Sequence, residues 1–141
     1  MNAARSTPYT LAVLPLLLAC AGNPAPGQAG YAYNVEGDYS AEFVAEGTTY
    51  AGTAVLGTAP GGAVTGEFQI TEPTGVTGTI AGTLTADQLA LEMDFEIPDI
   101  GCSGSASGTL TVAEGGDSAE GEVEIQADCD SPGRATFRLF R

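Results

Sequence analysis

The chain has 141 residues and a formal net charge of −14, because eighteen Asp and Glu residues oppose four Lys and Arg residues. With so few cations, the sequence offers no basic patch that could displace counterions from phosphate, which argues against binding to nucleic acid or anionic lipid head groups. It also has no His, the side chain best suited to general acid–base catalysis near neutral pH.

The first 19 residues have the three parts of an export signal: Arg5 at the start, an apolar segment over 9–18, and the small residue Ala19 before a cleavage point. The apolar segment is too short to span a bilayer. The run Leu17-Leu18-Ala19-Cys20 resembles the lipobox of bacterial lipoproteins. This resemblance implies that the thiol of Cys20 is diacylated, that residues 1–19 are removed, and that the protein is a cell-envelope lipoprotein attached to a membrane.

Two further expectations concern location and domain boundaries. In enteric lipoproteins, a residue other than Asp after the lipidated cysteine directs the protein to the outer membrane, so Ala21 implies an outer-membrane location. Residues 20–36 are rich in Ala, Gly and Pro, which predicts a flexible tether. Residues 37–141 then form one domain with a modest core.

From residue 38 onward, apolar and polar residues alternate in runs separated by Gly, Pro, Asp or Asn, a pattern typical of successive β-hairpins. The predicted strands lie near 38–46, 49–58, 63–71, 76–85, 88–97, 102–113, 118–129 and 134–140. They predict an all-β domain with an eight-stranded antiparallel up-and-down meander, closed into a barrel so that no edge strand remains.

Two other arrangements fit the same strands. A two-sheet sandwich is the stronger, since periodicity does not separate it from a flattened barrel. An outer-membrane barrel with its apolar side facing lipid is the weaker, because that side is full of Gly and Ala and lacks aromatic girdles. The predicted shape is loosely similar to calycin and streptavidin-like barrels, in fold only.

Pairing the strands across their turns sets large apolar residues opposite small ones. A hairpin around Gly115-Gly116 places Val112 opposite Ala119 and Gly108 opposite Val123, and the same register brings Cys102 opposite Cys129. Lipidation of Cys20 would leave these two cysteines to form a disulfide in an oxidising compartment.

The remaining hairpins predict further pairs and an outer seam. The expected pairs are Phe43 with Gly52, Ala41 with Ala54, Phe68 with Gly78, Ile80 with Met93, and Phe137 with Ala127. Closure would place Arg134 and Arg138 on the outer surface, near Glu42, Glu124 and Asp128, and would leave Phe140 on the outside.

No catalytic arrangement is expected, because there is no His and no Gly-x-Ser-x-Gly turn. No cofactor and no metal ion are expected either. Carboxylates at Asp94, Glu96, Asp99, Asp128 and Asp130 could in principle gather around Ca²⁺, but without EF-hand spacing they are interpreted as a solvated acidic rim.

The sequence therefore predicts a lipid-anchored, non-enzymatic binding or structural domain, with an envelope protein or a cationic partner as its target. The alternative is a carrier of a small apolar ligand held inside the barrel. The candidate residues for that carrier site are Tyr39, Phe43, Tyr50, Phe68, Met93, Phe95 and Phe137.

Overall fold

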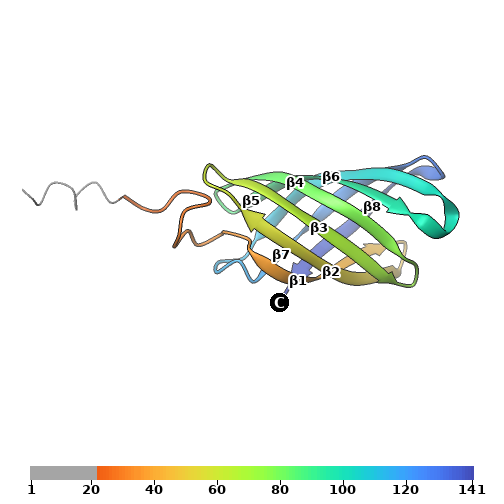
Figure 1. The fold of residues 1–141 in the computed structure, drawn as a ribbon, viewed down its shortest axis with the longest axis horizontal. Coiled ribbons are helices and arrows are strands. Elements are labelled where there is room, and N and C mark those ends of the chain that lie inside the picture. The colour runs from red at the N-terminus through yellow and green to blue at the C-terminus, as the bar shows by residue number, and fades with distance from the viewer. Residues whose placement is uncertain (1–21) are drawn as a thin grey trace, which may run out of the picture.

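A computed structural model describes residues 22–141, so the predicted signal peptide and Cys20 lie outside the described residues. The described chain forms a closed barrel of eight antiparallel strands in sequence order, with β8 hydrogen-bonded to β1 (Figure 1). The strands are β1 (Gly37–Ala45), β2 (Thr48–Thr58), β3 (Ala63–Glu72), β4 (Val76–Thr85), β5 (Gln88–Ile97), β6 (Cys102–Val112), β7 (Ser118–Ala127) and β8 (Asp130–Phe140). A single-turn 3-10 helix, η2 (Pro98–Ile100), joins β5 to β6. The predicted barrel is confirmed, and the sandwich alternative is wrong.

The apolar side of every strand faces the interior of the barrel. On β6, for example, Cys102, Ala106, Leu110 and Val112 are buried, while the Ser and Thr residues between them are exposed. Burial of these alternating side chains determines which side of each strand faces the interior, because a register shift of one residue would expose its apolar side chains to water. The carboxylates of the strands therefore lie on the outer surface.

Several predicted registers are confirmed. Val112 pairs with Ala119 and Gly108 with Val123 across β6 and β7. Phe68 pairs with Gly78, and Ile80 pairs with both Gly66 and Met93. These hairpins alternate large and small inward residues, so the two strands of each pair fill one layer of the core without colliding.

The predicted register of β1 with β2 is wrong by two residues. Phe43 pairs with Tyr50 rather than Gly52, and Ala41 pairs with Gly52 rather than Ala54. The turn is centred on Glu46-Gly47, whose φ angles are 50° and 79°. Two positive φ values are the requirement of a two-residue type I′ hairpin, which pairs Ala45 directly with Thr48. A shift of two residues keeps every side chain on its predicted face.

The predicted register of β7 with β8 is also wrong. Phe137 pairs with Gly121 rather than Ala127, because β8 begins at Asp130 and pairs it with Ala127 across a two-residue turn. The predicted strands end near 129 and begin again near 134, which leaves 130–133 as a loop. The register shifts between Ile125 and Ala127, and such an irregularity tolerates a proline that cannot donate to the sheet.

Residues 24–36 do not form a free tether, which corrects the predicted domain boundary. We call residues 24–35 of this segment the cap. Val35 is fully buried in the core, and Tyr31 and Tyr33 pack against it. The backbone makes successive turns closed by hydrogen bonds from Gln28 N to Ala25 O and from Tyr31 N to Gln28 O. In Figure 1 the cap is the orange segment that folds back against one end of the barrel.

Candidate functional site

The two ends of the barrel differ in how they are closed. One, the capped end, consists of the loops 59–62, 86–87 and 113–117 together with the cap. The other, the open end, consists of the turns 46–47, 73–75, 98–101 and 128–129. Each end collects alternate turns because the strands run up and down.

The cap is fastened to all three loops of the capped end. Gly61 N donates to Pro26 O at 3.2 Å, and Gly115 N donates to Ala32 O at 2.7 Å. The hydroxyl of Tyr31 donates to Ala86 O at 2.8 Å. With these contacts, the cap seals the end of the core and joins it as a structural part of the domain.

Thr58 holds the last turn of the cap. Its Oγ1 accepts from Val35 N at 3.1 Å and donates to Val35 O at 2.8 Å. Thr58 is the only buried polar or charged residue among those the structure describes, and both hydrogen-bonding functions of its hydroxyl are used. The Thr58 hydroxyl therefore satisfies the buried N–H and C=O of Val35, as a neighbouring strand would.

Near the capped end, Tyr39 links the two ends of the described chain. Its hydroxyl donates to Gly116 O at 2.6 Å and lies 2.7 Å from Nη2 of Arg141. The Arg141 guanidinium also stacks over the Tyr39 ring, 4.5 Å from its centre, and donates to Glu36 O. The hydrogen bond with Tyr39 raises the pKa of Arg141 above its usual value, so this guanidinium stays charged.

Most of the candidate carrier residues pack against one another and fill the interior. Phe43 stacks on Phe137 with ring centres 4.4 Å apart and lies 5.7 Å from Phe68. Phe68 and Phe95 each lie over a glycine of the neighbouring strand: a Cβ at Gly78 or Gly104 would come within 2.5 Å of the ring. Burial of the seven candidates varies. Tyr39, Phe68, Met93 and Phe137 are buried, whereas Phe43, Tyr50 and Phe95 are partly exposed.

The partly exposed apolar residues are concentrated toward the open end. Phe43, Ala45, Tyr50, Val76, Phe95 and Ile125 pack against the core without being fully covered. By contrast, leucines near the capped end such as Leu84, Leu89 and Leu110 are at most 1% exposed. An apolar ligand would therefore meet the core at the open end.

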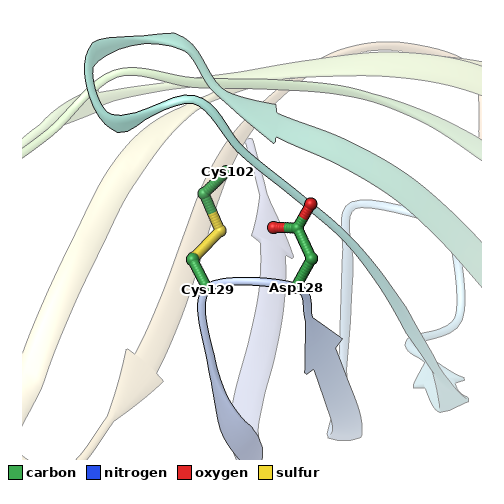
Figure 2. Close-up of side chains that lie close together, drawn as sticks. All are labelled: Cys102, Asp128 and Cys129. Atoms are coloured by element: carbon green, nitrogen blue, oxygen red, sulfur yellow. A yellow bond between two sulfur atoms is a disulfide. The ribbon is translucent and has the colours of Figure 1, made fainter.

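The predicted disulfide is present at the open end, where it joins the start of β6 to the β7–β8 turn (Figure 2). Cys102 and Cys129 have Cα atoms 5.5 Å apart. Beside them, Asp128 accepts a hydrogen bond from Ser103 N at 3.0 Å, and its own N–H donates to Ser103 O at 2.9 Å.

Among residues 22–141, the one cluster of three potential metal ligands is Cys102, Asp128 and Cys129. Both sulfurs are already bonded to each other, so neither is a free thiolate ligand. Asp94, Glu96, Asp99 and Asp130 do not join this cluster. The geometry gives no specific cation site in the acidic rim.

The outer surface has two electrostatically different sides. The three arginines within residues 22–141 are Arg134, Arg138 and Arg141, all on or just after β8. Their nearest carboxylates are Glu122 and Glu124 for Arg134, Glu42 and Glu120 for Arg138, and Asp117 for Arg141, at 3.2–3.8 Å. The predicted seam near Glu42 and Glu124 is confirmed. Phe140 is half-buried beside Arg138, rather than fully outside.

The other side carries carboxylates without arginines. Glu67 on β3 pairs with Thr79 on β4, which pairs with Asp94 on β5, so the two acids are separated by one hydroxyl across the sheet. Glu96 lies two residues after Asp94 on the same outer face of β5, where it pairs with Thr77 of β4. These three carboxylates, here called the acidic wall, border a shallow concavity of about 720 Å³ that crosses β2 to β6. Its exposed lining also includes Thr53, Val55, Gln69, Thr77 and Ser103.

Sequence reasoning found the interior side chains and the disulfide but missed the cap. The available signal was the spacing of Tyr31, Tyr33 and Val35, three apolar residues in a stretch otherwise made of small and polar ones. The acidic wall was not recognised from the sequence, although the predicted registers of β3 with β4 and of β4 with β5 already place Glu67 and Asp94 on either side of Thr79.

Comparison with known proteins bears on the fold alone. No protein-family model and no curated protein matches the chain. A redesigned β-barrel, 18% identical, matches 76% of this chain and 90% of its own with a TM-score of 0.58. The redesigned barrel mFAP1, bound to DFHBI, is 20% identical over 76% of this chain and 94% of its own, with the same TM-score. A de novo fluorescence-activating β-barrel is 18% identical over 82% of this chain and 97% of its own, with a TM-score of 0.51.

Residues 22–141 contain no helix long and apolar enough to span a membrane.

Proposed function

We propose that this protein is a cell-envelope lipoprotein, anchored through acylated Cys20 in the outer membrane, whose barrel is a non-enzymatic binding domain. Support for the anchor comes from the lipobox-like run that ends at Cys20. Two acyl chains, each contributing about 0.8 kcal/mol per buried methylene, hold a protein stably on a bilayer.

The observation that carries the binding function is the separation of charge on the barrel surface. All three arginines of the described chain lie along β8, while the concave acidic wall on β3 and β5 offers three carboxylates among hydroxyl groups. A cationic segment of an envelope protein fits this surface, because it would replace carboxylate–carboxylate repulsion with opposite-charge contacts and would be guided to it by the field of the acidic face.

Incorporation of a labelled fatty acid tests the anchor. Wild-type protein expressed with its own signal should acquire label and float with membranes, and Cys20→Ser should do neither. An unlabelled wild type that remains in the aqueous fraction would refute the proposed anchor.

A lysine-rich peptide tests the acidic wall. Binding to the purified domain is measured by fluorescence anisotropy for wild type, for the triple variant E67Q/D94N/E96Q, and for the control E120Q/E122Q/E124Q. Both variants raise the net charge by the same amount. The proposal expects a loss of at least about tenfold, or 1.4 kcal/mol, for the wall variant and a clearly smaller loss for the control. Equal losses would mean that net charge alone attracts the peptide.

The alternative function, carriage of a small apolar ligand, is favoured by the partly exposed apolar residues at the open end. A tryptophan at Ala45, which lies on the inward face at this end, would block entry, whereas one at the neighbouring Val44, on the outward face, would not. If the domain takes up a fluorescent apolar probe in a saturable way, and A45W abolishes uptake while V44W preserves it, the barrel is a carrier.

A further inference from the structure

The surface of the cap differs in charge from the rest of the domain. Residues 22–35 include no Asp, Glu, Lys or Arg, although the remaining 106 residues of the described chain hold eighteen carboxylates. The loop it contacts, Ala59-Pro60-Gly61-Gly62, is uncharged as well. The other loops at the capped end carry Asp87, Glu114 and Asp117, the last of which lies 3.8 Å from Arg141.

Two tyrosines belong to this uncharged surface. The rings of Tyr31 and Tyr33 meet edge to face with centres 5.8 Å apart, and both are partly exposed. Tyrosine combines an apolar ring with a polar hydroxyl, and for that reason it is enriched at the boundary between bilayer and water. At the open end, by contrast, carboxylates lie in or beside the turns at Glu46, Glu72, Asp99 and Asp128.

The chain between the proposed anchor and the folded cap is short. Ala25, whose backbone is fixed by hydrogen bonds to Gln28, is five residues after Cys20. Five residues span at most about 18 Å when fully extended. The seventeen-residue tether expected from the sequence would have allowed about three times that reach.

We infer that the capped end of the barrel is the surface that faces the lipid head groups, so that the barrel stands on the membrane with its open end and disulfide directed away from it. This inference rests on the proposed lipid anchor. The short connection keeps the cap near the bilayer, and residues 22–35 themselves bring no carboxylate to the head groups. The carboxylates at the same end are Glu36, Asp87, Glu114 and Asp117, and the last of these is paired with Arg141. Lying on its side would instead bring the acidic wall or the glutamates of β7 against the head groups.

In this orientation the open end lies roughly 25 Å farther from the bilayer than the cap, given strands of about ten residues tilted as in a small barrel. The acidic wall stands between them, roughly perpendicular to the membrane. A partner would approach from the side or from the aqueous phase, and not through the bilayer.

The chain contains no Trp, so a single introduced tryptophan reports one position. Full-length lipidated variants A29W in the cap, V55W on the outer wall and I100W at the open end are reconstituted into phosphatidylethanolamine vesicles with spin-labelled head groups. Ala29 is exposed, and Val55 and Ile100 are 54% and 66% exposed, so each site accepts the larger side chain at the surface. Thermal unfolding of each variant checks that it folds as wild type does.

Spin labels quench fluorescence only near contact, so A29W should be quenched several-fold more strongly than I100W, with V55W close to I100W. Equal quenching of A29W and I100W, or strongest quenching of V55W, would overturn the orientation while leaving the anchor intact. If the wild type carries no lipid and fails to float with the vesicles, both the anchor and the orientation are refuted.

Discussion

Phe68 and Phe95 fill the space that a side chain would occupy at Gly78 and Gly104, on the adjacent strands. Each ring covers the glycine backbone of its cross-strand partner, which shields that backbone from water and lets the wall approach the core closely. The same two glycines line the floor of the outer concavity. The aromatic and glycine pairs thus shape both the interior and the outer wall.

Gly78→Ala should destabilise the barrel by about 1–3 kcal/mol, because its methyl group would overlap the backbone carbonyl oxygen of Asp94 and the Phe68 ring, and overpacked cores lose stability on this scale. Urea unfolding at equilibrium measures the loss. Gly57→Ala is the matched control: it also lies within a strand but has no atom within 4 Å of its added Cβ. Equal stability of the two variants would show that the ring moves aside freely.

The cap is the part of this domain that differs most from the sequence prediction, which assigned it to a flexible tether. It contributes Val35 to the core and satisfies its own backbone through Thr58, Asn34 and the loops of the capped end. Asn34 Oδ1 accepts from Gly27 N at 2.8 Å, and its amide group donates to Gln28 O at 2.7 Å. An uncharged, Pro- and Gly-rich segment is therefore ordered by specific hydrogen bonds rather than by a regular element.

Thr58→Val keeps the shape of the side chain but removes both hydrogen bonds to Val35. Leaving a buried N–H and C=O without partners costs about 1–3 kcal/mol, and hydrogen exchange should accelerate through residues 25–35. Thr58→Ser, which retains the hydroxyl, should stay close to wild type in both measurements. Loss of stability without faster exchange in the cap would contradict this role for Thr58.

The disulfide is a second constraint between elements, because it connects the start of β6 to the β7–β8 turn. It links residues 27 positions apart, and loop-closure entropy predicts a contribution of about 3–4 kcal/mol. In a soluble Cys20→Ser background, the variant C102A/C129A should lose this amount in denaturant unfolding, and a reductant should lower the stability of the parent but not of the variant. An unchanged midpoint would mean that the disulfide does not stabilise the domain by restricting the unfolded chain.

The sequence predicted the strands, which side of each strand faces the interior, and three of the registers, because alternation and the pairing of large with small residues are local in the sequence. It misplaced β1 against β2, since Gly47 fits either position of a two-residue turn, and only the positive φ at Glu46 decides between them. It misplaced β8 because Pro132 is typical of a loop, whereas in the structure Ser131 and Pro132 form an irregularity within β8, opposite Gln126 of β7. The spacing of Tyr31, Tyr33 and Val35 indicates that the cap has buried residues, but not its conformation, which depends on hydrogen bonds to loops far away in the sequence.

At the scale of the whole molecule, charge repulsion opposes folding. The described chain carries eighteen carboxylates and three arginines, and the exposed ion pairs along β8 contribute little each. A compact barrel brings the remaining carboxylates closer together than the unfolded chain does.

Added NaCl should therefore stabilise the domain. At about 1 M salt the screening length falls to about 3 Å, and a gain of about 1 kcal/mol would raise the unfolding temperature of a domain of this size by roughly 3–5 °C. Thermal scans with NaCl, and with sucrose as an uncharged control for general solute effects, measure the difference. A falling midpoint in NaCl would show that the ion pairs of β8 outweigh the repulsion.

Closure of the barrel joins the two most distant parts of the domain. Residues 40–44 of β1 pair with 136–140 of β8, and Arg141 contacts Glu36 and Tyr39. Folding must bring these segments together across nearly the whole chain, and pairings of such long sequence separation form slowly. A circular permutant that connects Arg141 to the start of the cap and opens the chain at a turn of the open end would make the pairing of β8 with β1 local in the sequence. Its ring of strands would be unchanged, and the long-range pairing would move to the two strands beside the new opening, so its contact order and refolding rate should stay close to those of the parent.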